Sequence, residues 1–170
     1  MLSNYLFGVN ETVREYVRLT QELDARDTPV VLVLFGDHKP WMGNGGSVYE
    51  EMGIDFDTST LAGFRNYYAT PYLIWANRAA KEVLGADFTG DGGDFSPCFL
   101  MTRLFDACGW AGPGYMQLSR AMRDISPLLH TNGLFLHDGV LTSVLSDTDR
   151  SFYRSWLAVQ YYREHVAAYS

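Results

Sequence analysis

The sequence predicts an α/β fold with few, mostly parallel strands, flanking helices, and a hairpin and a helix at its C-terminal end. Residues 30–35 (VVLVLF) form a continuous apolar and largely β-branched run, which suits a strand that is covered on both faces. Residues 70–77 (TPYLIWAN) indicate a second buried strand, opened by a proline where a missing amide is tolerated. Helical periodicity precedes and follows these runs, which is the pattern of α/β proteins.

The composition limits the size and the partners of the protein. Its 170 residues, 47% hydrophobic and 15% aromatic, suffice for a single domain over residues 1–170 with a substantial core. The net charge of −7, without clustered Lys and Arg, argues against nucleic acid and anionic membrane surfaces as partners. No apolar run approaches the ~18 residues of a membrane span, and the first residues lack the pattern of a signal peptide. We therefore expect the chain itself to be soluble.

In the N-terminal half, the spacing of apolar residues predicts a helix over about residues 10–25, with Asn10 as its N-cap. Residues 41–64 mix Gly, Asn, Ser, Asp and Thr, with only a short helical hint around residues 47–52, so a long loop is expected there, with residues 58–60 in solvent. Loops of this length are usually functional or mobile. Asn77 ends the second strand and is expected to cap the helix that follows it.

In the C-terminal half, residues 96–109 (SPCFLMTRLFDACG) have the pattern of a helix with a serine cap, a proline at the first position and a stop glycine. A further helix is expected over about 115–124. The pair Asp138-Gly139 between apolar runs is a strong signal for a β-hairpin. Helical spacing returns from 147 or 148 to about 166, which predicts the last helix.

Asp37 and His38 follow the first predicted strand directly, in the sequence GDHKP. In open α/β sheets, ligands bind beyond the carboxyl ends of the strands. A carboxylate oxygen and an imidazole nitrogen suit Zn, Mn or Fe-type cations. Asp37 could equally bond the backbone of a polar turn while His38 packs beside it. The residues by themselves leave both a metal half-site and a plain turn open.

Three segments, in order, carry a resemblance to a known family: GDHKP, YYATPYLIWAN and DFSPCFLMTRLFDACG. Over roughly residues 10–110 the chain resembles the C-terminal part of the sulfatase-like catalytic domain of lipoteichoic acid synthases and related phosphoglycerol or phosphoethanolamine transferases. These enzymes belong to the alkaline phosphatase superfamily, so the resemblance implies a partial alkaline phosphatase-like sandwich. The rest of the chain carries little that aligns.

The resemblance also implies a metal site. In such enzymes the Asp-His pair at this strand end ligates Mn, Mg or Zn, which assigns the metal to Asp37 and His38. Lys39 is a candidate for contact with a substrate phosphate, with a solvated charge as the alternative. The metal lowers the pKa of a threonine or serine nucleophile and offsets charge on the phosphoryl oxygens. That nucleophile and an acidic ligand would lie upstream of residue 1, so no catalytic nucleophile is expected in this chain.

Two classes of function follow from this sequence. The first is the C-terminal fragment of a metal-dependent sulfatase-like phosphotransferase or hydrolase, incomplete alone, acting on phospho- or sulfo-esters of cell-envelope lipids or glycans. By resemblance, its parent would work at the extracytoplasmic face of the cell membrane, on a phospholipid head group or an envelope glycan. The alternative is a non-catalytic binding or oligomerising module that keeps part of the fold. An unfinished sheet edge would also favour homo-oligomers.

Overall fold

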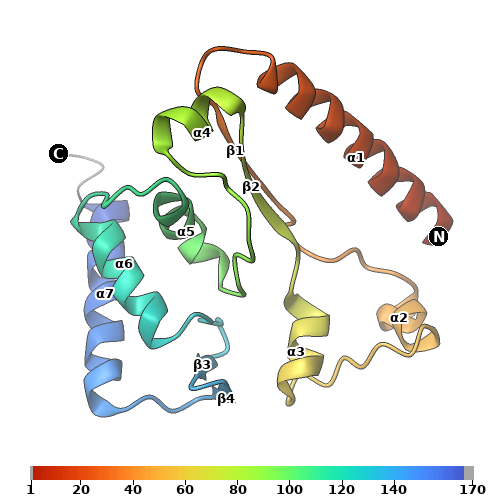
Figure 1. Ribbon diagram of the computed structural model, residues 1–170. Coiled ribbons are helices and arrows are strands. Elements are labelled where there is room, and N and C mark those ends of the chain that lie inside the picture. Colours follow the sequence, from red (N-terminus) through yellow and green to blue (C-terminus); the bar gives the residue numbers. More distant parts are fainter. Residues whose placement is uncertain (1, 167–170) are drawn as a thin grey trace. The chain divides into compact units, whose positions relative to one another are not determined.

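The computed structural model describes residues 2–166, which fall into two compact units: unit 1 extends to Phe88 and unit 2 begins at Thr89. Unit 1 contains α1 (Leu2–Asp24), β1 (Val31–Phe35), the 3-10 turn η1 (Asn44–Gly46), α2 (Ser47–Glu51), α3 (Leu61–Tyr68), β2 (Tyr72–Ala76) and α4 (Arg78–Leu84) (Figure 1). Unit 2 contains η2 (Pro97–Phe99), α5 (Leu100–Ala107), α6 (Gly114–Ile125), β3 (Phe135–His137), β4 (Val140–Thr142) and α7 (Asp147–His165). The predicted α/β class is confirmed, whereas a single folding domain over residues 1–170 stays a prediction.

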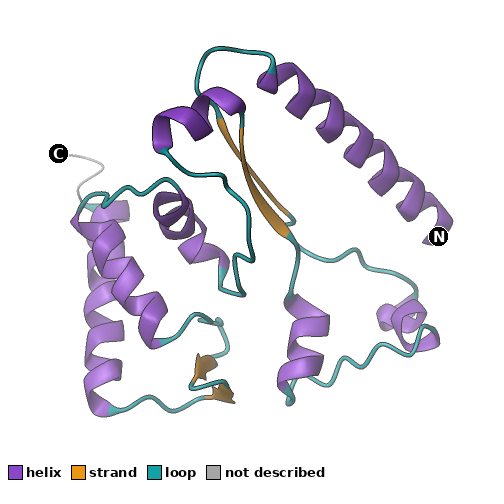
Figure 2. Cartoon of the chain, viewed as in Figure 1, coloured by secondary structure: helices purple, strands orange, loops and turns teal. Residues whose placement is uncertain are grey.

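The strands pair in antiparallel fashion, so the predicted parallel arrangement is wrong. β1 and β2 form a two-stranded sheet in which Leu32 lies opposite Trp75 and Phe35 opposite Tyr72 (orange in Figure 2). A continuous apolar run indicates how much of a strand is covered, and it carries no information on the direction of the neighbouring strand. The antiparallel register brings the end of β1 to the beginning of β2.

The predicted C-terminal hairpin and helix are confirmed. β3 and β4 are antiparallel neighbours, joined through Asp138 and Gly139. Both turn residues have positive φ, 49° and 77°, as the tightest hairpin turns require. Helix α7 then begins after Ser146, whose hydroxyl accepts the amide of Asp149 at 3.1 Å. This hairpin is predictable because its signal lies in two adjacent residues.

Helix α1 begins at Leu2, well before the predicted start, so Asn10 lies inside the helix and does not cap it. The apolar spacing that predicted the helix continues upstream through Leu6 and Val9, and Gly8 alone does not interrupt it. Only Leu23 of this helix is buried. Several of its apolar side chains are exposed by two fifths or more, namely Tyr5, Leu6, Phe7, Val9, Val13 and Val17.

The segment predicted as a long loop contains two helices, α2 and the beginning of α3. Thr60 is the N-cap of α3, since its hydroxyl accepts the amide of Gly63 at 3.0 Å. Thr60 is exposed, as predicted, and its capping role is an addition that the sequence did not indicate. Gly63 is required there, because a Cβ atom would lie 2.1 Å from the carbonyl oxygen of Asp57. The polar composition of the loop hid this cap.

Asn77 joins three elements of unit 1, and its predicted role as the cap of α4 is confirmed. Its side chain is fully buried, and Oδ1 accepts the amides of Ala80 and Val30, both at 2.9 Å. Its Nδ2 donates to the carbonyl oxygens of Leu23 at 3.0 Å and Thr28 at 2.9 Å. One side chain therefore fixes the end of α1, the entry to β1 and the start of α4.

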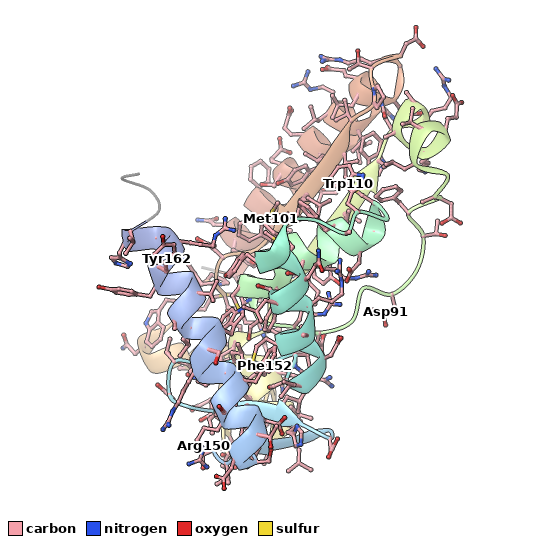
Figure 3. The ribbon with its side chains drawn as sticks, turned by 90° about the vertical axis from the view of Figure 1, so that its left-hand side faces the viewer. Asp91, Met101, Trp110, Arg150, Phe152 and Tyr162 are labelled. Carbon is pink, nitrogen blue, oxygen red and sulfur yellow. The ribbon has the colours of Figure 1, made fainter. Side chains whose placement is uncertain are left out.

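Unit 2 is a helical unit built around Phe99, Met122 and Trp156, which are all buried. Helices α6 and α7 lie side by side in Figures 1 and 3. The indole Nε1 of Trp156 donates to the buried hydroxyl of Ser119 at 3.0 Å, so these two buried polar groups of α7 and α6 satisfy each other. The helix expected to begin at Ser96 starts instead with the 3-10 turn η2. The side chain of Ser96 makes no capping hydrogen bond there.

Among the described residues 2–166, none of the helices combines the length and the apolar character that a membrane span requires.

Candidate functional site

The candidate site is the turn that follows β1 and carries Asp37 and His38. Gly36, the residue before the pair, is bonded to the segment that enters β2. Its amide donates to the carbonyl oxygen of Pro71 at 3.0 Å, and its own carbonyl oxygen accepts the hydroxyl of Thr70 at 2.6 Å. The two sequence motifs Gly-Asp-His and Thr-Pro therefore meet in space. The antiparallel register, which the sequence did not predict, is what brings them together.

The side chains of Asp37 and His38 face one another on this turn. Oδ2 of Asp37 lies 3.5 Å from Nε2 of His38, and Oδ1 accepts the amide of His38 at 2.8 Å. Nδ1 of His38 lies 2.9 Å from the carbonyl oxygen of Lys39, which can only accept a hydrogen bond. In neutral imidazole this bond puts the proton on Nδ1 and leaves the lone pair on Nε2, beside the carboxylate. The two side chains are 80% and 77% exposed.

This donor set fits a divalent metal. Two ligands, each about 2.1 Å from a tetrahedral zinc ion, lie about 3.4 Å apart, close to the separation of the two facing atoms. A protonated imidazole in a weak ion pair with the carboxylate has the same separation, so the distance suits both states of His38. A backbone carbonyl that orients the second nitrogen of the ring is the usual support of a metal-binding histidine.

The pair supplies two ligands only. Among residues 2–166, no group of three or more His, Cys, Asp or Glu side chains is arranged to hold a metal ion. Structural zinc sites use four protein ligands and catalytic sites use three plus water. Within the described part of the chain, Asp37 and His38 thus supply fewer ligands than a protein metal site needs.

Lys39, the candidate phosphate contact, is held by the protein. Its ammonium donates to the carbonyl oxygen of Asn66 in α3, and burial lowers the pKa of Lys39. The next residue is fixed as well, because the hydroxyl of Tyr49 donates to the carbonyl oxygen of Pro40 at 2.7 Å. The chain after the Asp-His pair is thus attached to α2 and α3. Sequence reasoning missed Tyr49, because no local pattern links it to the turn.

Two tryptophans lie close to the Gly-Asp-His and Thr-Pro motifs in the sequence. Trp41 follows the turn closely and is 71% exposed, whereas Trp75 is half-buried within β2. Trp41 lies on the surface, three residues beyond His38.

Comparison with known proteins gives one informative match. No family model matches this chain, and no solved structure matches it. A protein of Rhizobium meliloti (strain 1021), named "Putative cyclic beta-1,2-glucan modification protein", is 27% identical over 121 residues. The match covers 68% of this chain and 17% of that protein. The chain thus spans about a sixth of the length of this relative.

Proposed function

We propose that this chain is the C-terminal part of a metal-dependent, sulfatase-like transferase or hydrolase that modifies a glycan of the cell envelope. The observation that carries the proposal is the pair Asp37 and His38, whose facing atoms lie 3.5 Å apart on a turn fixed to both strands. The name of the Rhizobium relative supports a glucan as substrate. The phospho- or sulfo-ester chemistry rests on the resemblance of the three segments.

The residues of this chain would hold and orient the metal, which supplies Lewis-acid chemistry to a phosphoryl or sulfuryl group when bound. Asp37 contributes a negative charge, and His38 contributes Nε2 with its orientation set by the carbonyl of Lys39. Lys39, whose ammonium is bonded to the carbonyl oxygen of Asn66, would add positive charge to the same segment and so favour an anionic ester. The nucleophile and the remaining ligands would come from a preceding part of the protein, at the extracytoplasmic face of the membrane.

A second candidate function is a non-catalytic binding or oligomerising module. It is favoured by the lack of a third metal ligand among residues 2–166 and by the exposed apolar side chains of α1. Such a module would contact a second copy or a partner through α1 and the open edges of the β1–β2 sheet. A single assay of phosphodiester hydrolysis separates the two functions.

The assay measures hydrolysis of bis-(p-nitrophenyl) phosphate with Mn or Zn, by the chain alone and by the chain extended with the coding sequence before Met1. The enzyme proposal expects turnover from the extended protein only. Asp37→Ala and His38→Ala should each reduce it by at least about 100-fold, because even residues that only support a ligand contribute about 10–100-fold. Glu51→Ala, an exposed acid in the same unit, is the matched control.

Full turnover by the extended Asp37→Ala protein would contradict the metal role of the pair. Lack of turnover by every extended form would favour the non-catalytic module. Turnover by the chain alone, above that of its His38→Ala variant, would exclude the module and would show that the nucleophile lies within residues 1–170.

A further inference from the structure

Unit 2 contains a cavity that neither the metal pair nor the sequence motifs explain. Its volume is about 370 Å³, at the lower end of the ~300–1,000 Å³ typical of small-molecule sites. It lies between the loop before η2, helix α5 and the end of α6; Asp91 marks this loop in Figure 3. The cavity is lined by Gly92, Asp94, Phe95, Arg103, Arg123, Asp124 and Pro127.

Hydrogen bonds hold the walls of this cavity in place. The amide of Ser96 donates to the carbonyl oxygen of Pro127 at 2.8 Å, and the hydroxyl of Ser96 both donates to and accepts from the backbone of Leu129. Nε of Arg103 donates to the carbonyl oxygen of Gly92 at 3.3 Å. The loop is therefore bonded both to the segment after α6 and to α5, so the cavity is preformed.

Arg123 contributes a polar atom for which the protein supplies no partner. Its Nη2 is bonded to Asp106 at 2.7 Å, and its side chain is only 17% exposed. Its Nη1 is buried and has no hydrogen-bond partner among the described residues. A buried donor without an acceptor is costly, and each such group calls for an explanation. Arg123 lines the cavity, so a rotation of its guanidinium group would let an oxygen atom of a bound ligand supply the missing acceptor.

The charges around the cavity balance. Two arginines, Arg103 and Arg123, and two aspartates, Asp94 and Asp124, line the cavity, so an anion gains no net attraction. Guanidinium groups donate hydrogen bonds and carboxylates accept them, which together match hydroxyl groups that do both. Phe95 adds apolar surface at the same wall. We propose that this cavity binds a neutral saccharide through its hydroxyl groups.

The choice of a β-1,2-linked glucan as the saccharide rests on the proposed function, whereas the polar and uncharged character of the ligand rests on the cavity. The Asp37–His38 pair belongs to unit 1 and the cavity to unit 2, so separate substitutions test them. If the metal role fails and saccharide binding persists, the proposed function falls and the cavity keeps its ligand. If the metal role holds and saccharide binding fails, the metal proposal stands and the cavity proposal falls.

The test is a titration of the ¹⁵N-labelled chain with sophorose, the β-1,2-linked glucose disaccharide, and in parallel with inorganic phosphate, followed by amide shifts. Saturable shifts are expected at residues 92–95, 103 and 123–127 with sophorose only. Arg103→Gln and Asp124→Ala should each weaken binding by about tenfold, since each removes a hydrogen bond to a charged group. Arg154→Gln, an exposed arginine on α7 outside the cavity, is the matched control.

Asp124 is 71% exposed, so its replacement should leave the fold intact even where that of Arg103 disturbs the loop. Unperturbed amides elsewhere in the spectrum of each variant verify the fold. If phosphate shifts the amide signals of the same residues, the ligand of the cavity would be an anion and not a saccharide. Absence of saturable sophorose shifts, or equal affinity in the Asp124→Ala variant, would overturn the proposal.

Discussion

Replacement of Asn77 by alanine is expected to lower the free energy of unfolding of unit 1 by about 4 kcal/mol, the largest single effect that we predict. The variant removes the N-cap of α4, takes one of two donors from the carbonyl oxygen of Leu23 and leaves the carbonyl oxygen of Thr28 without its donor. It also leaves the amide of Val30 without its acceptor. Because whole domains are stable by only about 5–15 kcal/mol, much of the unit should unfold.

Urea-induced unfolding followed by near-UV circular dichroism measures this loss, and Asn10→Ala is the matched control. Asn10 is exposed within α1, so alanine there should be neutral or slightly stabilising. Asn77→Asp separates a simple cap from the wider role, because it keeps the acceptor for Ala80 but places a carboxylate against carbonyl oxygens. An Asn77→Asp protein as stable as the wild type would show that the cap alone matters.

Replacement of Asp106 by asparagine is expected to destabilise unit 2 by about 3 kcal/mol at neutral pH. Asp106 accepts from Nε of Arg120 at 2.6 Å and from Nη2 of Arg123 at 2.7 Å. Burial by itself would raise the pKa of Asp106, but the hydrogen bonds from the two arginines outweigh it and hold this pKa below its ordinary value. Without the carboxylate, two largely buried guanidinium groups would lose the counter-charge that they share.

The sign of the pH dependence follows from the lowered pKa. The stability contributed by Asp106 is fully present above its unfolded pKa of about 3.9 and is lost as the pH falls through the lower pKa of the folded state. The difference between wild type and Asp106→Asn in urea unfolding should therefore narrow progressively below about pH 4. The exposed Asp124→Asn variant should change stability by less than about 0.5 kcal/mol. A constant difference down to pH 2 would refute the assigned role of Asp106.

The features that sequence reasoning predicted correctly are local ones. The hairpin at Asp138 and Gly139 and the cap at Asn77 each depend on a few adjacent residues, whose backbone preferences suffice to indicate them. Asp37 and His38 are likewise neighbours in the sequence itself. What needed the structure is the orientation of His38 Nε2 toward the carboxylate, which depends on the carbonyl of Lys39.

The features that sequence reasoning missed depend on segments far apart in the chain. The antiparallel pairing of residues 31–35 with 72–76 follows from tertiary packing, which apolar runs do not encode. The start of α3 was hidden in a polar stretch, where Thr60 acts as a cap. The cavity of unit 2 joins residues 92–95, Arg103 and 123–127, whose spacing follows no motif.

The most direct test of the central claim, that Asp37 and His38 form half of a metal site, is paramagnetic broadening of the ¹⁵N-labelled chain by Mn²⁺. A half-site binds weakly, but broadening reports where a weakly bound ion resides. We predict that the amides of residues 36–39 broaden first and that Asp37→Ala and His38→Ala each abolish this effect, while Glu51→Ala preserves it. Broadening spread over other acidic residues, with residues 36–39 unaffected or equally affected in the Asp37→Ala variant, would contradict the account.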